Sequence, residues 1–219
     1  MIERAYIQKL HSSTSRDYLS RMNDNKVEAM MKARQYGFEY WDGQRRYGYG
    51  GYKYIKGRWS DFAKSLIEDY KLTNSSKILD IGMGKGYLLY EIQTLLPEIQ
   101  LYGLDISSYA IQNKHPDLKG NFKVQPASKL EFEDGFFDLV FSLNTLHNLK
   151  LKECLLALSE MARVGKSQYL VVESFRNERE LFNLQCWALT ANLLLSVEDW
   201  LELFNLAGYK GDYEWIFFE

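Results

Sequence analysis

The sequence predicts an α/β fold in which a doubly wound, mostly parallel sheet is covered by helices on both faces. From Lys77 onward, short apolar runs alternate with segments whose apolar residues recur at helical spacing. The apolar runs are continuous, as is typical of parallel strands that are buried on both faces. The first run leads directly into a glycine-rich turn and a helix. Ligands bind such sheets at the carboxyl ends of the strands, so the chemistry is expected there.

The composition is that of a globular protein and argues against some partners. The 219 residues suffice for one large core, and 46% of them are hydrophobic and 26% charged. A net charge of −2 gives no general attraction to nucleic acid or membrane. The N-terminus shows no signal pattern, and the longest apolar run, residues 187–195, is too short and too polar to span a bilayer. We expect a cytoplasmic protein in which Cys154 and Cys186 are reduced core thiols.

The chain is expected to divide into an N-terminal helix and lid segment, residues 1–59, and a ligand-binding domain, residues 60–219. Residues 17–37 carry a loose apolar stripe at helical spacing. The next stretch, YWDGQRRYGYGGYKYIKGRW at 40–59, combines tyrosines and tryptophans with glycines and cations. From Lys26 to Arg58 eight cationic residues stand against three acidic ones, so the basic character is concentrated here.

The elements of the domain follow in order. Ser60 is expected to cap a helix over DFAKSLIEDYKL. Helices connect the strands, and a long helical region from Arg176 to Leu206 is expected to end at Gly208. The runs predicted to be strands are KILDIG (77–82), QLYGLDI (100–106), FKVQ (122–125), FFDLVFSL (136–143), SQYLVVES (167–174) and YEWIFFE (213–219).

The strongest motif follows the first strand. KILDIGMGKG places Gly82, Gly84 and Gly86 after Asp80, where glycines permit a tight turn and a close approach of the backbone to a ligand. The second strand ends at Asp105, 25 residues after Asp80. A carboxylate there can accept hydrogen bonds from both hydroxyls of a ribose. NAD-binding proteins usually have Gly-x-Gly-x-x-Gly, whereas the spacing here is Gly-x-Gly-x-Gly.

With this spacing the sequence resembles the class I S-adenosylmethionine-dependent methyltransferases, which have a Rossmann-like fold, across residues 60–208. The resemblance implies that Asp80 serves the amino group of the cofactor, that the three glycines back the cofactor and that Asp105 binds its ribose. It implies that the rest of the cofactor wall includes Ile106, Ala127, Ser128 and Asn144.

Two features depart from the family pattern. Pro126 stands where many relatives have an aspartate for the adenine amino group, so we expect adenine to be recognised by backbone groups or by Ser128. The family usually ends in an antiparallel pair of strands, and this chain has room for one, residues 213–219. We therefore expect a shortened sheet edge or a strand supplied from elsewhere.

Methyl transfer from a sulfonium is an in-line displacement, so the protein mainly supplies alignment. A base is needed only where the acceptor must lose a proton early. In SLNTLHNL, after the fourth strand, His147 is the candidate base and Asn144 the candidate partner of the acceptor, although His147 can equally well pack a helix start. The string lacks the prolines and the aromatic residue that nucleic-acid amino methyltransferases use. No carboxylate cluster follows this strand, so no metal is expected.

In class I methyltransferases the segment before the domain commonly covers the cofactor, so residues 40–59 are expected to form a lid over an acceptor. Arginine forks suit phosphate or carboxylate, and tyrosines offer flat walls. The candidate acceptor-binding residues are Arg45, Arg46, Tyr47, Tyr49, Tyr52, Glu173 and Arg176. Alternatively, the aromatic residues cover the rim of the sheet, and the arginines pair with Asp42 or Glu39.

The sequence therefore predicts a methyltransferase that uses S-adenosylmethionine, forms S-adenosylhomocysteine and modifies a hydroxyl or amine of a small, polar, anionic metabolite. The string RRYGYGGYKY resembles small bacterial methyltransferases of biosynthetic clusters. Two alternatives stay open. One is an RNA or DNA methyltransferase that uses the basic aromatic segment as a stacking platform, which the low net charge disfavours. The other is a non-catalytic cofactor-binding subunit of a partner enzyme. A monomer and a homodimer both agree with the sequence.

Overall fold

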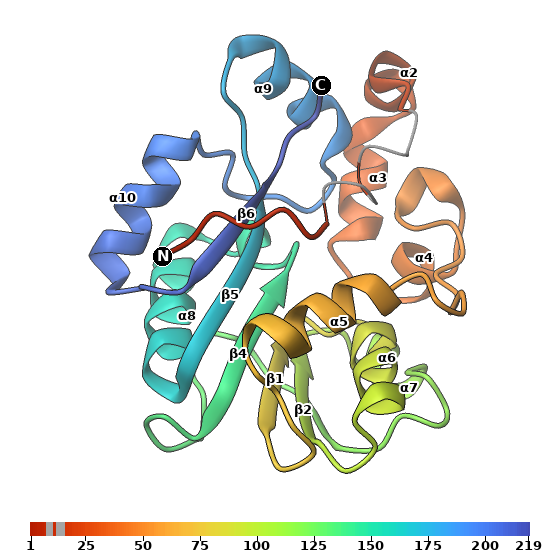
Figure 1. Cartoon of the computed structure of the whole chain (residues 1–219). Coiled ribbons are helices and arrows are strands. Elements are labelled where there is room, and N and C mark those ends of the chain that lie inside the picture. Colours follow the sequence, from red (N-terminus) through yellow and green to blue (C-terminus); the bar gives the residue numbers. More distant parts are fainter. Residues whose placement is uncertain (8–10, 12–15) are drawn as a thin grey trace.

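A parallel sheet forms the centre of the protein. The computed structural model describes residues 1–7, 11 and 16–219. Within these residues the sheet has six strands in the order β3-β2-β1-β4-β5-β6, and every neighbouring pair is parallel (Figure 1). The strands are β1 (Lys77–Ile81), β2 (Gln100–Asp105), β3 (Asn121–Val124), β4 (Phe137–Leu143), β5 (Gly165–Glu173) and β6 (Asp212–Ile216). The predicted doubly wound sheet is confirmed.

Both faces of the sheet are buried, which explains the continuous apolar runs. Neighbouring residues along a strand belong to opposite cores: Ile78 packs in one hydrophobic cluster and Leu79 in the other. One core includes α5 (Ser60–Asp69) and α6 (Tyr87–Leu95), and the other includes α8 (Leu151–Val164) and α10 (Val197–Ala207). The remaining helices of this domain are α7 (Ser108–Gln112), η2 (Leu146–Asn148) and α9 (Glu178–Trp187).

The predicted helix over residues 17–37 is divided. Asp17 caps α2 (Tyr18–Asn23) by accepting a hydrogen bond from the backbone N–H of Ser20. Asn25 then has φ 42°, a left-handed conformation that breaks the helix before α3 (Lys26–Ala33). The lid stretch is mostly irregular and contains two short helices, α4 (Phe38–Trp41) and η1 (Arg45–Tyr47).

The predicted helical region over 176–206 is also divided, into α9 and α10. In the intervening segment the backbone N–H groups of Asn192 and Leu193 donate to the carbonyl of His147, at 3.0 and 2.9 Å. This long-range pairing replaces helical hydrogen bonds. Gly208 has φ 68° and ends α10 as predicted. Ser60 is the first residue of α5 rather than its cap, and its hydroxyl donates to Glu91.

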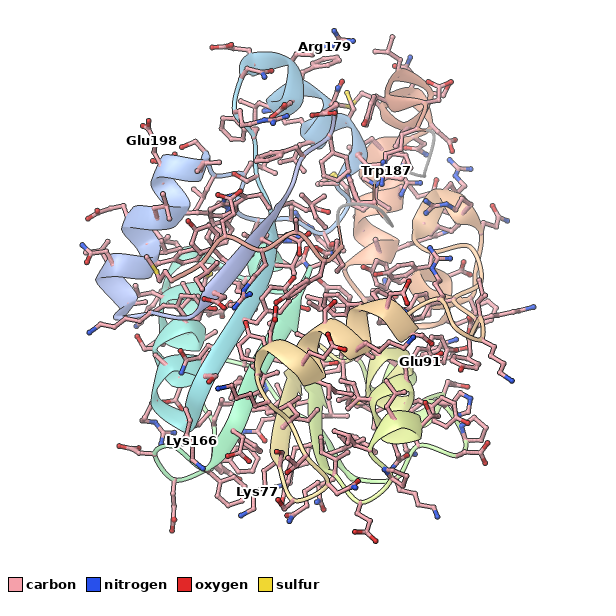
Figure 2. All side chains as sticks on the ribbon, in the orientation of Figure 1. Lys77, Glu91, Lys166, Arg179, Trp187 and Glu198 are labelled. Carbon is pink, nitrogen blue, oxygen red and sulfur yellow. The ribbon has the colours of Figure 1, made fainter. Side chains whose placement is uncertain are left out.

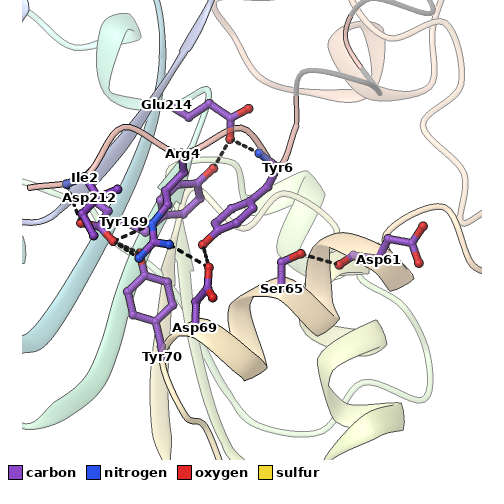
Figure 3. Close-up of polar contacts among 10 residues, drawn as sticks. All are labelled: Ile2, Arg4, Tyr6, Asp61, Ser65, Asp69, Tyr70, Tyr169, Asp212 and Glu214. Atoms are coloured by element: carbon purple, nitrogen blue, oxygen red, sulfur yellow. Dashed lines mark hydrogen bonds and ion pairs between the residues drawn. The ribbon is translucent and has the colours of Figure 1, made fainter.

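The chain's own N-terminus completes the sheet edge that the sequence left open. Residues 2–4 run beside β6, where the N–H of Arg4 donates to the carbonyl of Tyr213 and the N–H of Tyr213 donates to the carbonyl of Ile2 (Figure 1). Arg4 forms ion pairs with Asp69 and Asp212 (Figure 3).

Glu214, which is 2% exposed, holds the residues that follow. Its carboxylate accepts hydrogen bonds from the backbone N–H of Tyr6 and from the hydroxyl of Tyr169 (Figure 3). It also accepts one from the backbone N–H of Ile7. The N-terminal segment is therefore fixed to β5 and β6 by buried polar contacts.

Candidate active site

The glycine loop joins β1 to α6 in the conformation that the sequence predicts. Gly82, Gly84 and Gly86 have φ values of 83°, 55° and 69°, where other residues are strained. A Cβ atom on Gly82 would collide with the hydroxyl of Thr145, and one on Gly84 would lie 2.8 Å from the Trp41 ring. Glycine at these two positions therefore also allows the close packing of Thr145 and of the lid residue Trp41.

Two buried carboxylates stand at the tips of β1 and β2. Asp105 accepts hydrogen bonds from the backbone N–H groups of Gly84 and Ser107, both at 2.8 Å, which fix its orientation. Asp80 is 4% exposed, and its Oδ1 atom has no hydrogen-bond partner. Burial, reinforced by the Asp105 carboxylate, raises the pKa of Asp80 well above its ordinary value. A cationic partner would relieve this unfavourable burial.

A cavity of about 270 Å³ opens at the carboxyl ends of β1, β2 and β4. The predicted cofactor residues on its wall are Gly82, Asp105, Ile106, Ala127, Ser128 and Asn144. Asp80, Gly84 and Gly86 are not on this wall. Pro126 does line the cavity, and so does Gln125, whose side chain the sequence had not indicated. We call this space the cofactor cavity.

Aromatic residues of the lid form another wall of the cofactor cavity: Tyr36, Tyr40, Trp41 and Tyr49. The indole N–H of Trp41 donates to the carbonyl of Tyr36 and to the hydroxyl of Ser107, at 3.1 and 3.0 Å. The rings of Trp41 and Tyr49 stack with centroids 5.2 Å apart.

An ion pair ties the lid to the glycine loop. Lys85, 5% exposed, donates to both carboxylate oxygens of Asp42 at 2.7 Å and to the carbonyl of Tyr52. Asp42 thus pairs with Lys85 and not with the lid arginines.

A second cavity of about 280 Å³ adjoins the first. Its wall carries four arginines, Arg16, Arg21, Arg45 and Arg58, together with His11, which is uncharged at neutral pH because burial lowers its pKa to about 4. It also includes Trp187, which lies at the opposite end of the sheet from Lys77 and Lys166, the residues near the starts of β1 and β5 (Figure 2). The two cavities share Tyr40, Tyr49, Asn144 and Asn148, so they meet at these four residues. We call the second space the acceptor cavity.

The residues expected to serve catalysis gather where the cavities meet. Asn144 lines both cavities and has φ 53°, a left-handed conformation that asparagine tolerates better than most residues. His147 lines the acceptor cavity and is 3% exposed. Its Nε2 atom lies 3.4 Å from Oε2 of Glu173, and its Nδ1 atom accepts a 3.4 Å hydrogen bond from the backbone N–H of Glu173. Both ring nitrogens therefore face Glu173.

Burial lowers the pKa of His147, and the Glu173 carboxylate opposes this shift. The imidazole is consequently neutral at neutral pH. Because Nδ1 accepts the backbone hydrogen bond, the proton belongs on Nε2, where it points toward the Glu173 carboxylate. Glu173 also lines the acceptor cavity.

The other predicted acceptor residues have different positions. Of the seven candidates, Arg45, Tyr49 and Glu173 line the acceptor cavity. Arg46 pairs with Asp24 at 2.8 Å, the hydroxyl of Tyr47 donates to Glu28, the Tyr52 ring stacks on Tyr87, and Arg176 pairs with Glu180 and Glu219. None of these four lines either cavity.

Sequence reasoning missed several residues of the acceptor cavity. Arg16, Arg21 and Trp187 come from distant segments, and no local pattern marks them. Asn148 lines both cavities, and its Oδ1 atom is buried without a partner. The sequence could have indicated Asn148, because it directly follows His147 in SLNTLHNL.

The described part of the chain has neither a membrane-spanning helix nor a metal-binding cluster. None of its helices is long and apolar enough to cross a membrane. Residues 1–7, 11 and 16–219 contain no group of three or more His, Cys, Asp or Glu side chains that is arranged to hold a metal ion.

A parallel sheet with a glycine loop, a ribose-type carboxylate and a pocket at the strand ends defines a nucleoside-binding α/β protein. Residues 72–216 match the family described as "Methyltransferase domain", which is more than half of the chain. The chain belongs to this family, whose methyl donor is S-adenosylmethionine.

Two curated relatives match part of the chain. The phosphoethanolamine N-methyltransferase of Plasmodium falciparum is 28% identical over 106 residues, which are 47% of this chain and 40% of that protein. The malonyl-[acyl-carrier protein] O-methyltransferase of Legionella pneumophila is 33% identical over 76 residues, 32% of this chain and 26% of that protein. The chain thus aligns with less than half the length of either relative.

Solved structures share the fold. The YcgJ protein from Bacillus subtilis has a TM-score of 0.55 at 19% identity and covers 66% of each chain. A chain from the complex that contains the Trm112 methyltransferase activator of Haloferax volcanii has a TM-score of 0.52 at 22% identity, covering 68% of this chain and 72% of that one. At these identities the similarity concerns the fold.

The residues at the strand tips fit S-adenosylmethionine. The partnerless Oδ1 atom of Asp80 suits the cationic amino group of the methionine moiety. Asp105 is held by two backbone N–H groups and still lines the cavity, as a ribose-binding carboxylate must.

Proposed function

We infer that the chain transfers a methyl group from S-adenosylmethionine to a hydroxyl or amine of a small anionic metabolite. The observation that carries this proposal is the meeting of the two cavities at Asn144, Asn148, Tyr40 and Tyr49. A donor in the cofactor cavity and an acceptor in the acceptor cavity would approach each other across this boundary. Holding two reactants in this way is the main contribution that an enzyme makes to an in-line displacement.

In the cofactor cavity, the bound cofactor supplies a methyl group on a positively charged sulfur, which is already an activated electrophile. Asp80, which stands at the tip of β1 and not on the cavity wall, would hold the amino group, and Asp105 would accept hydrogen bonds from the ribose hydroxyls. The lid residues Trp41 and Tyr49 cover the cavity and exclude water from it. Pro126 offers no amide N–H, so adenine selection falls to the neighbouring backbone groups, Ser128 and Gln125.

In the acceptor cavity, we assign the proton transfer to Glu173 rather than to His147. Both imidazole nitrogens are engaged with Glu173, so His147 acts as a positioning residue that holds the carboxylate. Glu173 takes the proton that an acceptor hydroxyl loses as the new bond to carbon forms, or the proton that a neutral amine releases once its nitrogen has been methylated. Asn144 orients the acceptor atom from the boundary between the cavities.

The cationic wall supports an anionic acceptor. Four arginines line the acceptor cavity, and Glu173 is the carboxylate of its lining. The curated relatives are named for acceptors that carry a phosphate and a carboxylate group, phosphoethanolamine and malonyl-[acyl-carrier protein]. Both names agree with an acceptor that is recognised by its charge.

The test is transfer of label from methyl-labelled S-adenosylmethionine into a cell extract, with the products separated by size and then by anion exchange. The proposal predicts label in small anionic molecules. Label in the large fraction that is lost on nuclease treatment would identify a nucleic-acid methyltransferase. No label in any fraction, with the cofactor still bound, would identify a subunit that needs a partner. The Asp105→Asn variant, which should not hold the cofactor, is the control.

A further inference from the structure

We propose that the acceptor cavity contains a phosphate-binding site formed by Arg16, Arg21 and Arg45 around Trp187, so that the acceptor is a small phosphate monoester. The part of this inference that concerns the acceptor rests on the proposed function. The part that concerns anion binding can be tested without any methyl transfer.

Three guanidinium groups gather on one indole ring. The guanidinium carbons of Arg16, Arg21 and Arg45 lie 5.4, 5.2 and 5.3 Å from the ring centroid of Trp187. All four side chains line the acceptor cavity. Aromatic faces hold guanidinium groups flat and leave their N–H edges available. The cluster is assembled from three separate parts of the chain, namely the region of α2, the turn η1 and the end of α9.

Within the described residues, Arg21 and Arg45 form no ion pair with a carboxylate. Arg21 donates to the backbone carbonyls of Arg45 and Arg46, at 2.9 and 3.0 Å, and Arg45 donates to the carbonyl of Gly48. The Nε atom of Arg21 is buried and has no hydrogen-bond partner. Burial, together with the neighbouring Arg45, lowers the pKa of Arg21 to about 10. An anion in the cavity would offset the repulsion between these like charges.

The Glu173 carboxylate lies beside His147, and its charge partly opposes the lowering of the Arg16 pKa by burial. Elsewhere in the described residues a single arginine satisfies a carboxylate: Arg4 pairs with Asp212, and Arg176 pairs with Glu180. Arg21 and Arg45 therefore offer more guanidinium groups than one acceptor carboxylate needs. A phosphate monoester, with a charge of about −1.5 to −2 and three acceptor oxygens, matches these two groups.

The cluster also has a defined place relative to the reacting atoms. Trp187 and the three arginines line only the acceptor cavity, whereas Asn144 and Asn148 line both cavities. A phosphate held at Trp187 would anchor one end of the acceptor and direct its other end toward Asn144 and Glu173. The substrate class is therefore a short phosphate monoester with a hydroxyl or amino group at the opposite end.

Direct binding of inorganic phosphate and of acetate to the full-length chain tests the inference. Isothermal titration at constant ionic strength would measure both ions on the wild type, on Arg45→Gln and on Arg46→Gln. The last is a matched control, because Arg46 is the next residue but pairs with Asp24 outside the cavities. We expect phosphate to bind more tightly than acetate, Arg45→Gln to weaken phosphate by about tenfold or more, and Arg46→Gln to change it by less than about twofold.

Three results would overturn the inference: no binding of phosphate to the wild type, equal binding of acetate and phosphate, or equal weakening by the two variants. Should Arg45→Gln unfold, Arg45→Lys keeps the charge without the fork and is expected to bind phosphate with intermediate affinity. Because these titrations involve no methyl transfer, their failure leaves the proposed function standing, and a failed transfer assay leaves the phosphate site standing.

Discussion

The two cavities that meet at Asn144 are built in different ways. The cofactor cavity is lined mainly by the tips of β1, β2 and β4 and by the loops that follow them, all within residues that match the family. The acceptor cavity takes most of its charged wall from Arg16, Arg21, Arg45 and Arg58, which lie outside that match, and it closes against Trp187 and Glu173. Under the proposed function, this difference assigns donor binding to the sheet and acceptor selection to the N-terminal segment that lies over it.

If this division is correct, the largest effect comes from Glu173, which serves the chemistry and not the cofactor. Glu173→Gln keeps the shape but removes the proton acceptor, so kcat should fall by about 100- to 10,000-fold. Affinity for S-adenosylhomocysteine should stay within about twofold of the wild type. Steady-state kinetics and calorimetry measure the two quantities.

The control for this variant is Glu178→Gln, an exposed carboxylate in the first turn of α9. It should leave both quantities unchanged. A Glu173→Gln enzyme that retains its kcat would refute the assignment of the proton transfer.

A second effect concerns pH and the cofactor cavity alone. Burial and the Asp105 carboxylate raise the pKa of Asp80, so Asp80 takes up a proton as the pH falls through that raised value. Protonated Asp80 cannot pair with the ligand's ammonium group. The affinity for S-adenosylhomocysteine should therefore fall by up to about tenfold per pH unit below the raised pKa and level off above it.

The free energy of unfolding of the ligand-free protein should change with pH in the opposite direction. A raised pKa in the folded state stabilises the fold at low pH, and this contribution is lost as the pH rises through the raised value. The stabilisation that the ligand adds in thermal unfolding should thus grow with pH. In Asp80→Asn both dependences should flatten, and an unchanged pH profile in that variant would place the titration elsewhere.

A smaller effect tests the contact between lid and glycine loop. Gly84 has φ 55°, and in Gly84→Ala the added Cβ atom would lie 2.8 Å from the Trp41 ring. Gly57 also has a positive φ, 80°, but in Gly57→Ala the nearest atom to the added Cβ would be the hydroxyl oxygen of Ser60, 3.9 Å away. Both variants should lose about 1–2 kcal/mol of stability from the left-handed conformation. Only Gly84→Ala should also weaken cofactor binding, by about threefold to tenfold, because Trp41 must move. Equal binding by the two variants would show that Trp41 does not shape the cofactor cavity.

The cofactor half of the site could be predicted because its signal is local. Asp80, the three glycines and Asp105 lie in two short segments whose strand–turn–helix context is visible in the sequence. Parallel pairing of β1 with β2 then brings them together. The end of α10 at Gly208 followed from the same local rules.

The acceptor half could be predicted only in outline. Arg45 and Arg46 are neighbours, and nothing in the sequence says which faces a cavity; the turn η1 directs Arg45 to Trp187 and Arg46 to Asp24. Arg16 and Arg21 look like ordinary surface residues of a helix. Their position depends on the packing of α2 against α9, which is a contact between segments more than 150 residues apart. The helix break after Trp187 also has a tertiary origin, because Asn192 and Leu193 donate to the carbonyl of His147.

The division between donor and acceptor cavities is tested most directly by one kinetic comparison, made with the small acceptor that the labelling assay identifies. Steady-state constants for both substrates would be measured in the wild type, Asp105→Asn and Arg45→Gln. The account predicts that Asp105→Asn raises KM for S-adenosylmethionine by about 100-fold and leaves KM for the acceptor nearly unchanged, while Arg45→Gln does the reverse by about tenfold or more. Equal shifts of both constants in either variant would contradict it.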